Sequence, residues 1–204
     1  GISYMNSASQ KTKQVYTDLG VDQKLAQKKS TLTSYKPKIS TMSESQLQNV
    51  NKDINEIIST IPYTIYVTET LNIDPYLYYD DINKLYSDKT LAFKETLQDL
   101  NSRIEQKVEA KLIHVNYLSD KIEDYILVKM IITPKNSLKD ISIIEFIPKS
   151  LATSESLDFL DLQPQITSSG NYLEVKFHFD TLDSSTPNVV LYKIQSTNLD
   201  LVKD

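Results

Sequence analysis

The feature that most constrains the fold is a change in hydrophobic periodicity near Val108. Before this residue, apolar side chains recur every three or four positions; after it, they alternate with polar ones. The first spacing predicts one face of a helix, and the second predicts one face of a strand. The sequence therefore predicts a mainly helical domain at 1–107 and a β-rich domain at 108–204, with neither Gly nor Pro between 105 and 111.

Two helices are predicted before Pro62. The stretch 6–34 is polar with sparse apolar positions, which favours a long exposed helix that Pro37 ends. Ser43 and Gln46 then have the spacing of a capping box, in which two side chains satisfy backbone groups at a helix start. The helix that follows carries one apolar stripe, formed by Leu47, Val50, Ile54, Ile57 and Ile58.

A strand and a longer helix complete the first half. The stretch 61–71 is rich in β-branched and aromatic residues, which predicts a strand, and Asp74 with Pro75 begins a turn or a short helix. A helix is expected over 88–108, as one face of a helical hairpin or short coiled coil. Its near-heptad apolar positions are Phe93, Leu97, Leu100, Ile104 and Val108.

Alternating stretches dominate the second half. Turn signals separate them at intervals of roughly ten residues, which is typical of an antiparallel β-sandwich of immunoglobulin-like or fibronectin-like type. In the most regular stretch, every second residue from Leu173 to Phe179 is expected to face inward. The predicted fold class is therefore α+β, with a helical half followed by a sandwich. The strands are expected at 111–117, 125–133, 141–147, 173–179 and 188–194.

Composition excludes several kinds of chemistry. The chain has 204 residues and no cysteine, which excludes disulfides, thiolate catalysis, zinc fingers and iron–sulfur clusters. Its three glycines do not cluster, so no loop can cradle a phosphate as nucleotide-binding loops do. A formal net charge of -5 argues against a general nucleic-acid binder. No run of about 20 apolar residues could span a bilayer, and the first residues lack a signal-peptide pattern.

One segment carries a family resemblance. The strand that ends at Ile147 runs directly into Pro148-Lys149-Ser150, and small residues follow. The segment 145–152 resembles the Glu-x-Ile-Pro-Lys-Ser-x-Ala signature of β-sandwich domains in predicted archaeal cell-surface proteins. The later segments 162–164, 175–179 and 191–194 follow in the order of that family, so the resemblance covers roughly the last hundred residues. It implies an extracytoplasmic, membrane-anchored chain and brings no catalytic residue.

The proline in this segment predicts where the strand ends. Because Pro148 has no N–H to donate to a ladder, the strand is expected to end or bulge there. Ile147 is then the last inward-facing residue, in the extended geometry favoured before proline. The small residues that follow are expected to cross from one sheet to the other, which makes the motif a fold signature rather than a binding site.

Possible metal ligands are sparse. His114 and His178 are the two histidines of the chain, and each lies in an alternating stretch. Both are expected to be solvated, because a metal site would need further ligands beside them. No metal or cofactor is therefore predicted. The remaining alternative is a calcium site built by converging loops, with the ligands Asp158, Asp161, Asp180 and Asp183.

No catalytic group is predicted. The carboxylate pairs Asp80-Asp81 and Glu123-Asp124 are sequence neighbours, so their side chains diverge on a strand or a helix and do not face a common gap. They are expected to cap helices or to lie in solvent. No Gly-x-Ser-x-Gly elbow marks a serine nucleophile.

The densest aromatic cluster is the best candidate for a partner surface. Tyrosine combines a rigid apolar ring with a polar tip, which makes it a favoured interface residue. The alternative is a half-buried layer between the helices and the strand at 61–71. The cluster consists of Tyr63, Tyr66, Tyr76, Tyr78, Tyr79 and Tyr86.

Three functions remain open. The first is a non-enzymatic binding or structural module, the extracellular domain of a membrane-anchored archaeal surface protein, which contacts a protein partner or itself through its helical half. The second is an intracellular scaffold or adaptor that acts through the same helices. The third is a hydrolase hidden in the helical half. Membrane attachment would need segments outside residues 1–204, and no nucleic-acid partner is expected.

Overall fold

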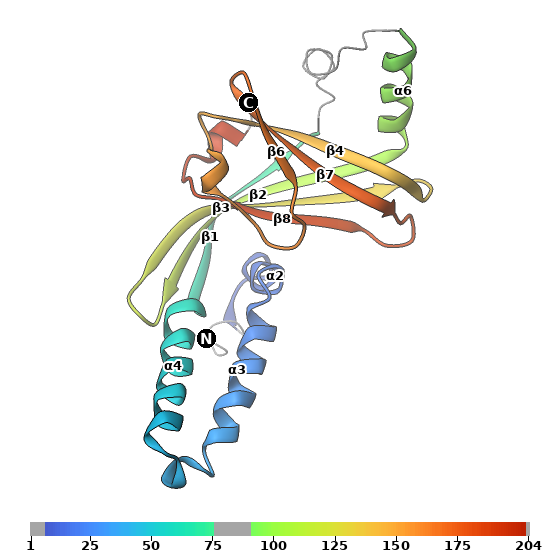
Figure 1. The fold of residues 1–204 in the computed structure, drawn as a ribbon. Coiled ribbons are helices and arrows are strands. Elements are labelled where there is room, and N and C mark those ends of the chain that lie inside the picture. The colour runs from blue at the N-terminus through green and yellow to red at the C-terminus, as the bar shows by residue number, and fades with distance from the viewer. Residues whose placement is uncertain (1–6, 76–90, 203–204) are drawn as a thin grey trace. The chain divides into compact units, whose positions relative to one another are not determined.

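The computed structural model describes residues 7–75 and 91–202, apart from the side chains at 91–93. Within these residues the chain forms four α-helices and eight strands in two antiparallel sheets, which confirms the predicted α+β class (Figure 1). The chain divides into two compact units, and each contains two separate segments. Unit 1 consists of Gly1–Thr68 and Ile113–Asp124, and unit 2 consists of Glu69–Leu112 and Tyr125–Asp204.

In the part of unit 1 that the structure describes there are three helices. The long helix predicted over 6–34 is wrong, because the chain breaks it at Gly20. Gly20 has a φ of 60°, a left-handed conformation that glycine adopts without steric cost, and it separates two helices. The helices are α2 (Gln10–Asp18), α3 (Val21–Tyr35) and α4 (Glu44–Thr60), with the short 3-10 turn η1 (Ile39–Thr41) before α4.

The predicted start of α4 is confirmed. Ser43 is the N-cap residue, and it forms a capping box with Gln46. The backbone N–H of Ser43 donates to Oε1 of Gln46 over 2.8 Å. This exchange satisfies groups that the first turn of a helix otherwise leaves without partners.

The helix predicted over 88–108 ends earlier than expected. The helix α6 (Leu91–Ser102) gives way to the strand β2 (Ile104–Tyr117). Ile104 and Val108 lie four residues apart, a spacing that places two side chains on one face of a helix and also on one face of a strand. Both pack against the core of unit 2 as strand residues, so the coiled-coil assignment of these two positions is wrong. The predicted domain boundary at 107–108 falls within β2.

The strands form one sheet of five and one sheet of three. The orders are β1-β2-β3-β8-β5 and β4-β7-β6. Each of the five stretches predicted in the second half lies within an observed strand, and 61–71 overlaps β1. The remaining bounds are β1 (Pro62–Ile73), β3 (Ile122–Pro134), β4 (Leu138–Pro148), β5 (Leu157–Phe159), β6 (Gln165–Ser169), β7 (Tyr172–Leu182) and β8 (Asn188–Ile194).

Both sheets contribute side chains to one hydrophobic core in unit 2. As predicted, Leu173, Val175 and Phe177 of β7 face this core, and the last two are fully buried. The ring of Phe177 lies 5.8 Å from that of Phe159 on β5 and 6.5 Å from that of Tyr192 on β8, measured between centroids. Aromatic pairs at such distances stabilise a core beyond the area that they bury.

The chain leaves one sheet for the other directly after Pro148, as predicted. Ile147 is the last buried residue of β4 and is 3% exposed. After it come a turn, the 3-10 helix η2 (Ser154–Ser156) and then β5, which belongs to the five-stranded sheet. The Ile-Pro-Lys-Ser segment thus marks a sheet-to-sheet crossing.

Candidate functional site

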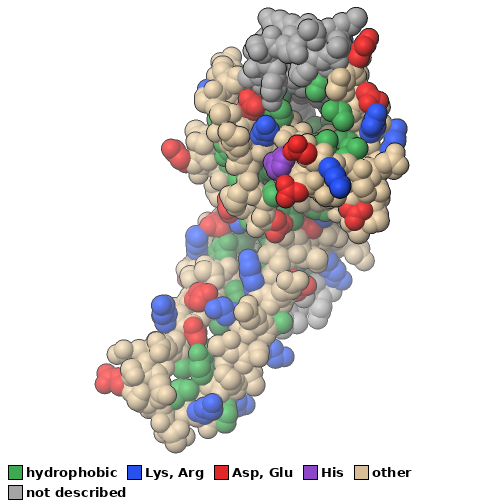
Figure 2. Space-filling model, turned by 45° about the vertical axis from the view of Figure 1, so that its right-hand side comes forward, with side chains coloured by type: hydrophobic (Ala, Val, Ile, Leu, Met, Phe, Trp, Pro, Cys, Tyr) green, Lys and Arg blue, Asp and Glu red, His purple; other side chains and the backbone are tan. Residues whose placement is uncertain are grey.

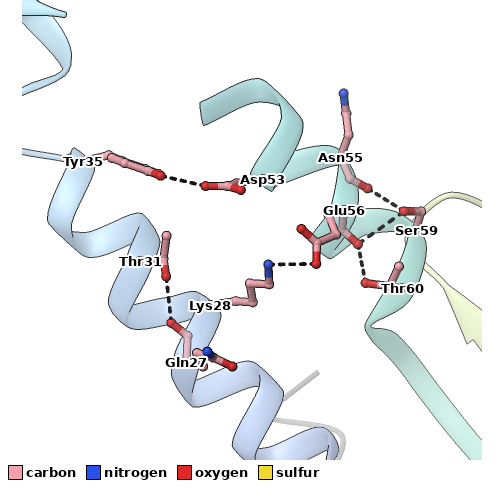
Figure 3. A network of polar contacts seen from close by, with 9 residues as sticks. All are labelled: Gln27, Lys28, Thr31, Tyr35, Asp53, Asn55, Glu56, Ser59 and Thr60. Atoms are coloured by element: carbon pink, nitrogen blue, oxygen red, sulfur yellow. Dashed lines mark hydrogen bonds and ion pairs between the residues drawn. The ribbon is translucent and has the colours of Figure 1, made fainter. Parts of the chain in front are cut away.

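We define the helical hairpin as α3, η1 and α4. Polar side-chain contacts connect α3 with α4 (Figure 3). The hydroxyl of Tyr35 donates to Oδ2 of Asp53 over 2.7 Å, and Nζ of Lys28 lies 2.9 Å from Oε1 of Glu56. The hydrogen bond to Asp53 is the main reason why the pKa of Tyr35 is raised above its ordinary value of 10.0. Partly exposed pairs of this kind add little stability, because water screens them and ordering long side chains costs entropy.

Apolar packing within the helical hairpin is equally thin. Both helices lie wholly within the described residues, yet α3 buries only Val21 and α4 buries only Val50. Three large apolar side chains stay exposed: Leu47 and Ile54 are each 38% exposed, and Ile39 is 51% exposed. We call these three residues the apolar strip. The stripe predicted on α4 is therefore only partly covered by its own chain.

The two helices of the hairpin carry opposite charge. Residues 21–38, which include α3, contain five lysines and one aspartate, whereas α4 contains three acidic residues and one lysine. In the space-filling view, hydrophobic side chains interrupt this charged surface (Figure 2). A surface with both apolar and complementary charged groups is suited to binding another protein.

Two of the six predicted partner tyrosines can be placed. Tyr63 and Tyr66 of β1 are 41% and 45% exposed, and strand alternation puts them on opposite faces. The ring of Tyr66 lies 6.2 Å from that of His114, and Nδ1 of His114 lies 2.7 Å from Oδ1 of Asp124. The other four predicted residues, Tyr76, Tyr78, Tyr79 and Tyr86, lie outside the described residues.

Each of the two histidines has an acidic neighbour of its own. His178 contacts Asp180 at 3.2 Å and lies 3.8 Å from Asp140, whereas His114 belongs to unit 1. Within the described part of the chain, no three His, Cys, Asp or Glu side chains come together as a metal site would require. The four aspartates of the calcium alternative do not converge there; Asp158 pairs with Lys193, for example.

The adjacent carboxylates also have separate partners. Glu123 accepts from the Tyr117 hydroxyl over 2.6 Å, whereas Asp124 contacts His114. The pair thus does not face a common gap. Asp80 and Asp81 lie outside the described residues.

One acidic residue that was not predicted as a site residue, Glu145, has an unusual environment. Glu145 lies on the core-facing side of β4, between Ile143 and Ile147, and is paired in register with the fully buried Val175. Its Oε1 accepts a hydrogen bond of 2.6 Å from the hydroxyl of Tyr192, which is 1% exposed. Its Oε2 is shielded from solvent and has no hydrogen-bond partner among the described residues.

This environment favours the neutral form of both groups. Burial raises the pKa of Glu145 from 4.5 to about 7, although the hydrogen bond from Tyr192 partly offsets this shift. Burial also raises the pKa of Tyr192 well above 10, and the charge of Glu145 adds to that effect. At neutral pH the pair is therefore a neutral phenol beside a carboxyl group that is close to half ionised.

A signal for Glu145 was present in the sequence. If Ile147 faces inward at the end of a strand, then every second residue before it does so too. Glu145 is the only charged member of the series 141, 143, 145 and 147. A charge on the inner face of a predicted core strand is uncommon enough to mark a candidate site.

Comparison with known proteins does not assign the chain to a family. No protein-family model, curated protein or solved structure matches the chain. Among the described residues, no helix has both the length and the apolar character needed to cross a membrane.

Proposed function

We propose that the chain is a non-enzymatic binding and structural module that associates with a second copy of itself through the helical hairpin. The observation that carries this proposal is the apolar strip, Ile39, Leu47 and Ile54, which the hairpin leaves exposed. A helix pair that buries one residue per helix gains little from its own packing. Covering the strip with another chain would add the apolar burial that the hairpin lacks.

Charge supports a second copy as the partner. In a twofold-symmetric dimer, the same surface of each copy meets the other. Such a dimer can place the lysine-rich helix α3 of each copy beside the acidic helix α4 of the other. Opposite charges then attract at both contacts. A partner of one charge sign would satisfy only one of the two helices.

The test uses a double substitution on the strip. Leu47→Glu with Ile54→Glu places two charges on the apolar strip and should abolish dimerisation, measured as molar mass by light scattering across a concentration series. The matched control is Gln48→Glu with Asn55→Glu. It adds the same charges at the same spacing to exposed positions, rotated by about 100° around the helix.

The expected result is a dimeric wild type, a dimeric control and a monomeric strip variant. Dimerisation should also weaken with added salt, because part of the attraction is between charges. A wild type that remains monomeric at high concentration would refute self-association, and so would a strip variant that dimerises as well as the control.

The resemblance of segment 145–152 supports two finer parts of the proposal. The first is that the two sheets of unit 2 form a β-sandwich of immunoglobulin-like or fibronectin-like type. The second is that the chain is the extracellular domain of a membrane-anchored archaeal surface protein. Protease added to intact cells should cleave the full-length protein. Protection of the full-length protein until lysis would favour the intracellular scaffold that acts through the same helices.

A further inference from the structure

We propose that a cavity lined by both sheets of unit 2 binds a small apolar ligand that carries an ammonium group, with Glu145 as the group that recognises it. This inference goes beyond the proposed function, because it concerns unit 2 and does not depend on self-association. It rests on three observations: the cavity, a carboxylate oxygen that has no hydrogen-bond partner among the described residues, and the sign of the charges around it.

The cavity has a volume of ≈ 170 Å³. Its walls are mostly apolar and come largely from β1, β2, β3, β4 and β8, with Val108, Met130 and Ile194 among them. An apolar cavity of about 150 Å³ is large enough to hold a molecule such as benzene. The space therefore suits a single aromatic ring or a short alkyl chain.

Glu145 supplies a directional contact in this apolar space. Tyr192 occupies its Oε1 at 2.6 Å, which leaves the shielded Oε2 without a partner among the described residues. A buried acceptor without a donor carries a desolvation cost that a ligand donor would remove. Glu145 and Tyr192 both line the cavity. Because Oε2 is shielded in this structure, a bound ligand reaches it once the carboxyl group of Glu145 rotates towards the cavity.

The surrounding charges favour a cation over an anion. Among the described residues that line the cavity, the charged side chains are Glu145 and Asp74, and there is no Lys, Arg or His. An ammonium group would donate to Oε2 and neutralise the carboxylate, and a charge-assisted bond of this kind is stronger than a neutral one. The apolar part of the ligand would fill the space between the sheets. Gln106 offers a further polar contact in the lining.

Two sources could supply such an ammonium group. One is a free monoamine, and the other is a lysine side chain of a partner protein, whose alkyl stem is also apolar. Benzylamine probes the first source and Nα-acetyl-lysine amide probes the second. Benzyl alcohol has the same size as benzylamine but no charge, and it serves as the neutral comparison for the free amine.

The experiment is a titration of the full chain followed by NMR, with the shifts of cavity-lining residues as the readout. We expect benzylamine or the lysine derivative to give saturable shifts, with binding about tenfold or more tighter than that of benzyl alcohol. Glu145→Gln should remove this preference. The control Glu155→Gln removes an exposed acid on the same unit and should retain it.

A pH series on the wild type tests the same point without a substitution at Glu145. Below pH 6 the amine should lose its advantage over benzyl alcohol, because Glu145 becomes protonated. The other titratable groups that line the cavity are Tyr192, which stays neutral, and Asp74. The variant Asp74→Asn measures how much Asp74 contributes to the pH dependence of amine binding. Equal binding of amine and alcohol, or a preference that survives Glu145→Gln, would overturn the proposal. So would the absence of saturable shifts with both amines.

Discussion

Replacing Glu145 by Gln should change how the stability of the protein depends on pH. The side chains have nearly the same shape, and Tyr192 can still donate to the oxygen that replaces Oε1. The substitution mainly removes the ability to ionise. At acidic pH the wild type has a neutral carboxyl group and the variant has a neutral amide. In each protein one polar group occupies the shielded position of Oε2, so the cost of burying it is similar. The two proteins should therefore be similarly stable at acidic pH.

The magnitude follows from the pKa shift. Burial raises the pKa of Glu145 from 4.5 to about 7 in the folded state, so folding favours the protonated acid. The folded protein is then most stable, as far as this group is concerned, below pH 4.5. Its stability falls as the pH rises towards 7 and stays lower above that. A change of one pKa unit corresponds to about 1.4 kcal/mol of free energy. The raised pKa of Glu145 therefore lowers the free energy of unfolding at pH 8 by about 3 kcal/mol.

The assay is urea unfolding of both proteins at steps from pH 4 to pH 8. Other carboxylates also titrate in this range, so the informative quantity is the difference in unfolding free energy between variant and wild type. It should be close to zero at pH 4 and grow to about 3 kcal/mol in favour of Glu145→Gln at pH 8. The control Glu155→Gln should follow the wild type. Parallel pH profiles for wild type and Glu145→Gln would refute the reasoning.

Four further outcomes are expected. Tyr192→Phe removes the donor that stabilises the carboxylate, so the pKa of Glu145 in the folded state should rise further. In the same urea series the fall in stability should still begin near pH 4.5, but it should continue to a higher pH and reach a larger total loss than in the wild type. Ile147→Ala should lower the free energy of unfolding by about 2–5 kcal/mol, since this side chain is 3% exposed. Lys149→Ala should lower it by less than about 1 kcal/mol, because the contact that it loses, Nζ to the Gly170 carbonyl at 2.7 Å, is exposed. Ser43→Ala should reduce the stability of α4 by about 1 kcal/mol, seen as a lower helical melting temperature by circular dichroism.

The elements that were predicted correctly are those whose local pattern and final environment agree. The stretch 173–179 alternates strictly, and its apolar side meets the core of unit 2. Ser43 and Gln46 form their capping box from a spacing of three residues, which needs no tertiary contact. In both cases local chemistry alone specifies the geometry.

The errors arose where one pattern was compatible with two structures. Ile104 and Val108 fit a helix face and a strand face equally well, and strand pairing in the sheet decided between them. The break at Gly20 was missed because a single glycine inside a polar helical stretch is often tolerated. Its left-handed backbone is a property of the folded chain. The contact of Tyr192 with Glu145 joins residues 47 positions apart, which no local pattern could reveal.

Glu145 also bears on how the Glu-x-Ile-Pro-Lys-Ser segment should be understood. Pro148 and Ile147 explain the end of the strand and the crossing between sheets by themselves, so a purely structural motif needs no acid before them. At neutral pH the acid destabilises the folded state, and an apolar residue at this position would pack against Val175 without that cost. An acid that lowers stability, and that keeps one oxygen without a described partner beside a cavity, is more consistent with ligand recognition than with folding. The proposed role of Glu145 would thus place a recognition residue two positions before the structural half of the segment, Ile147 to Ser150.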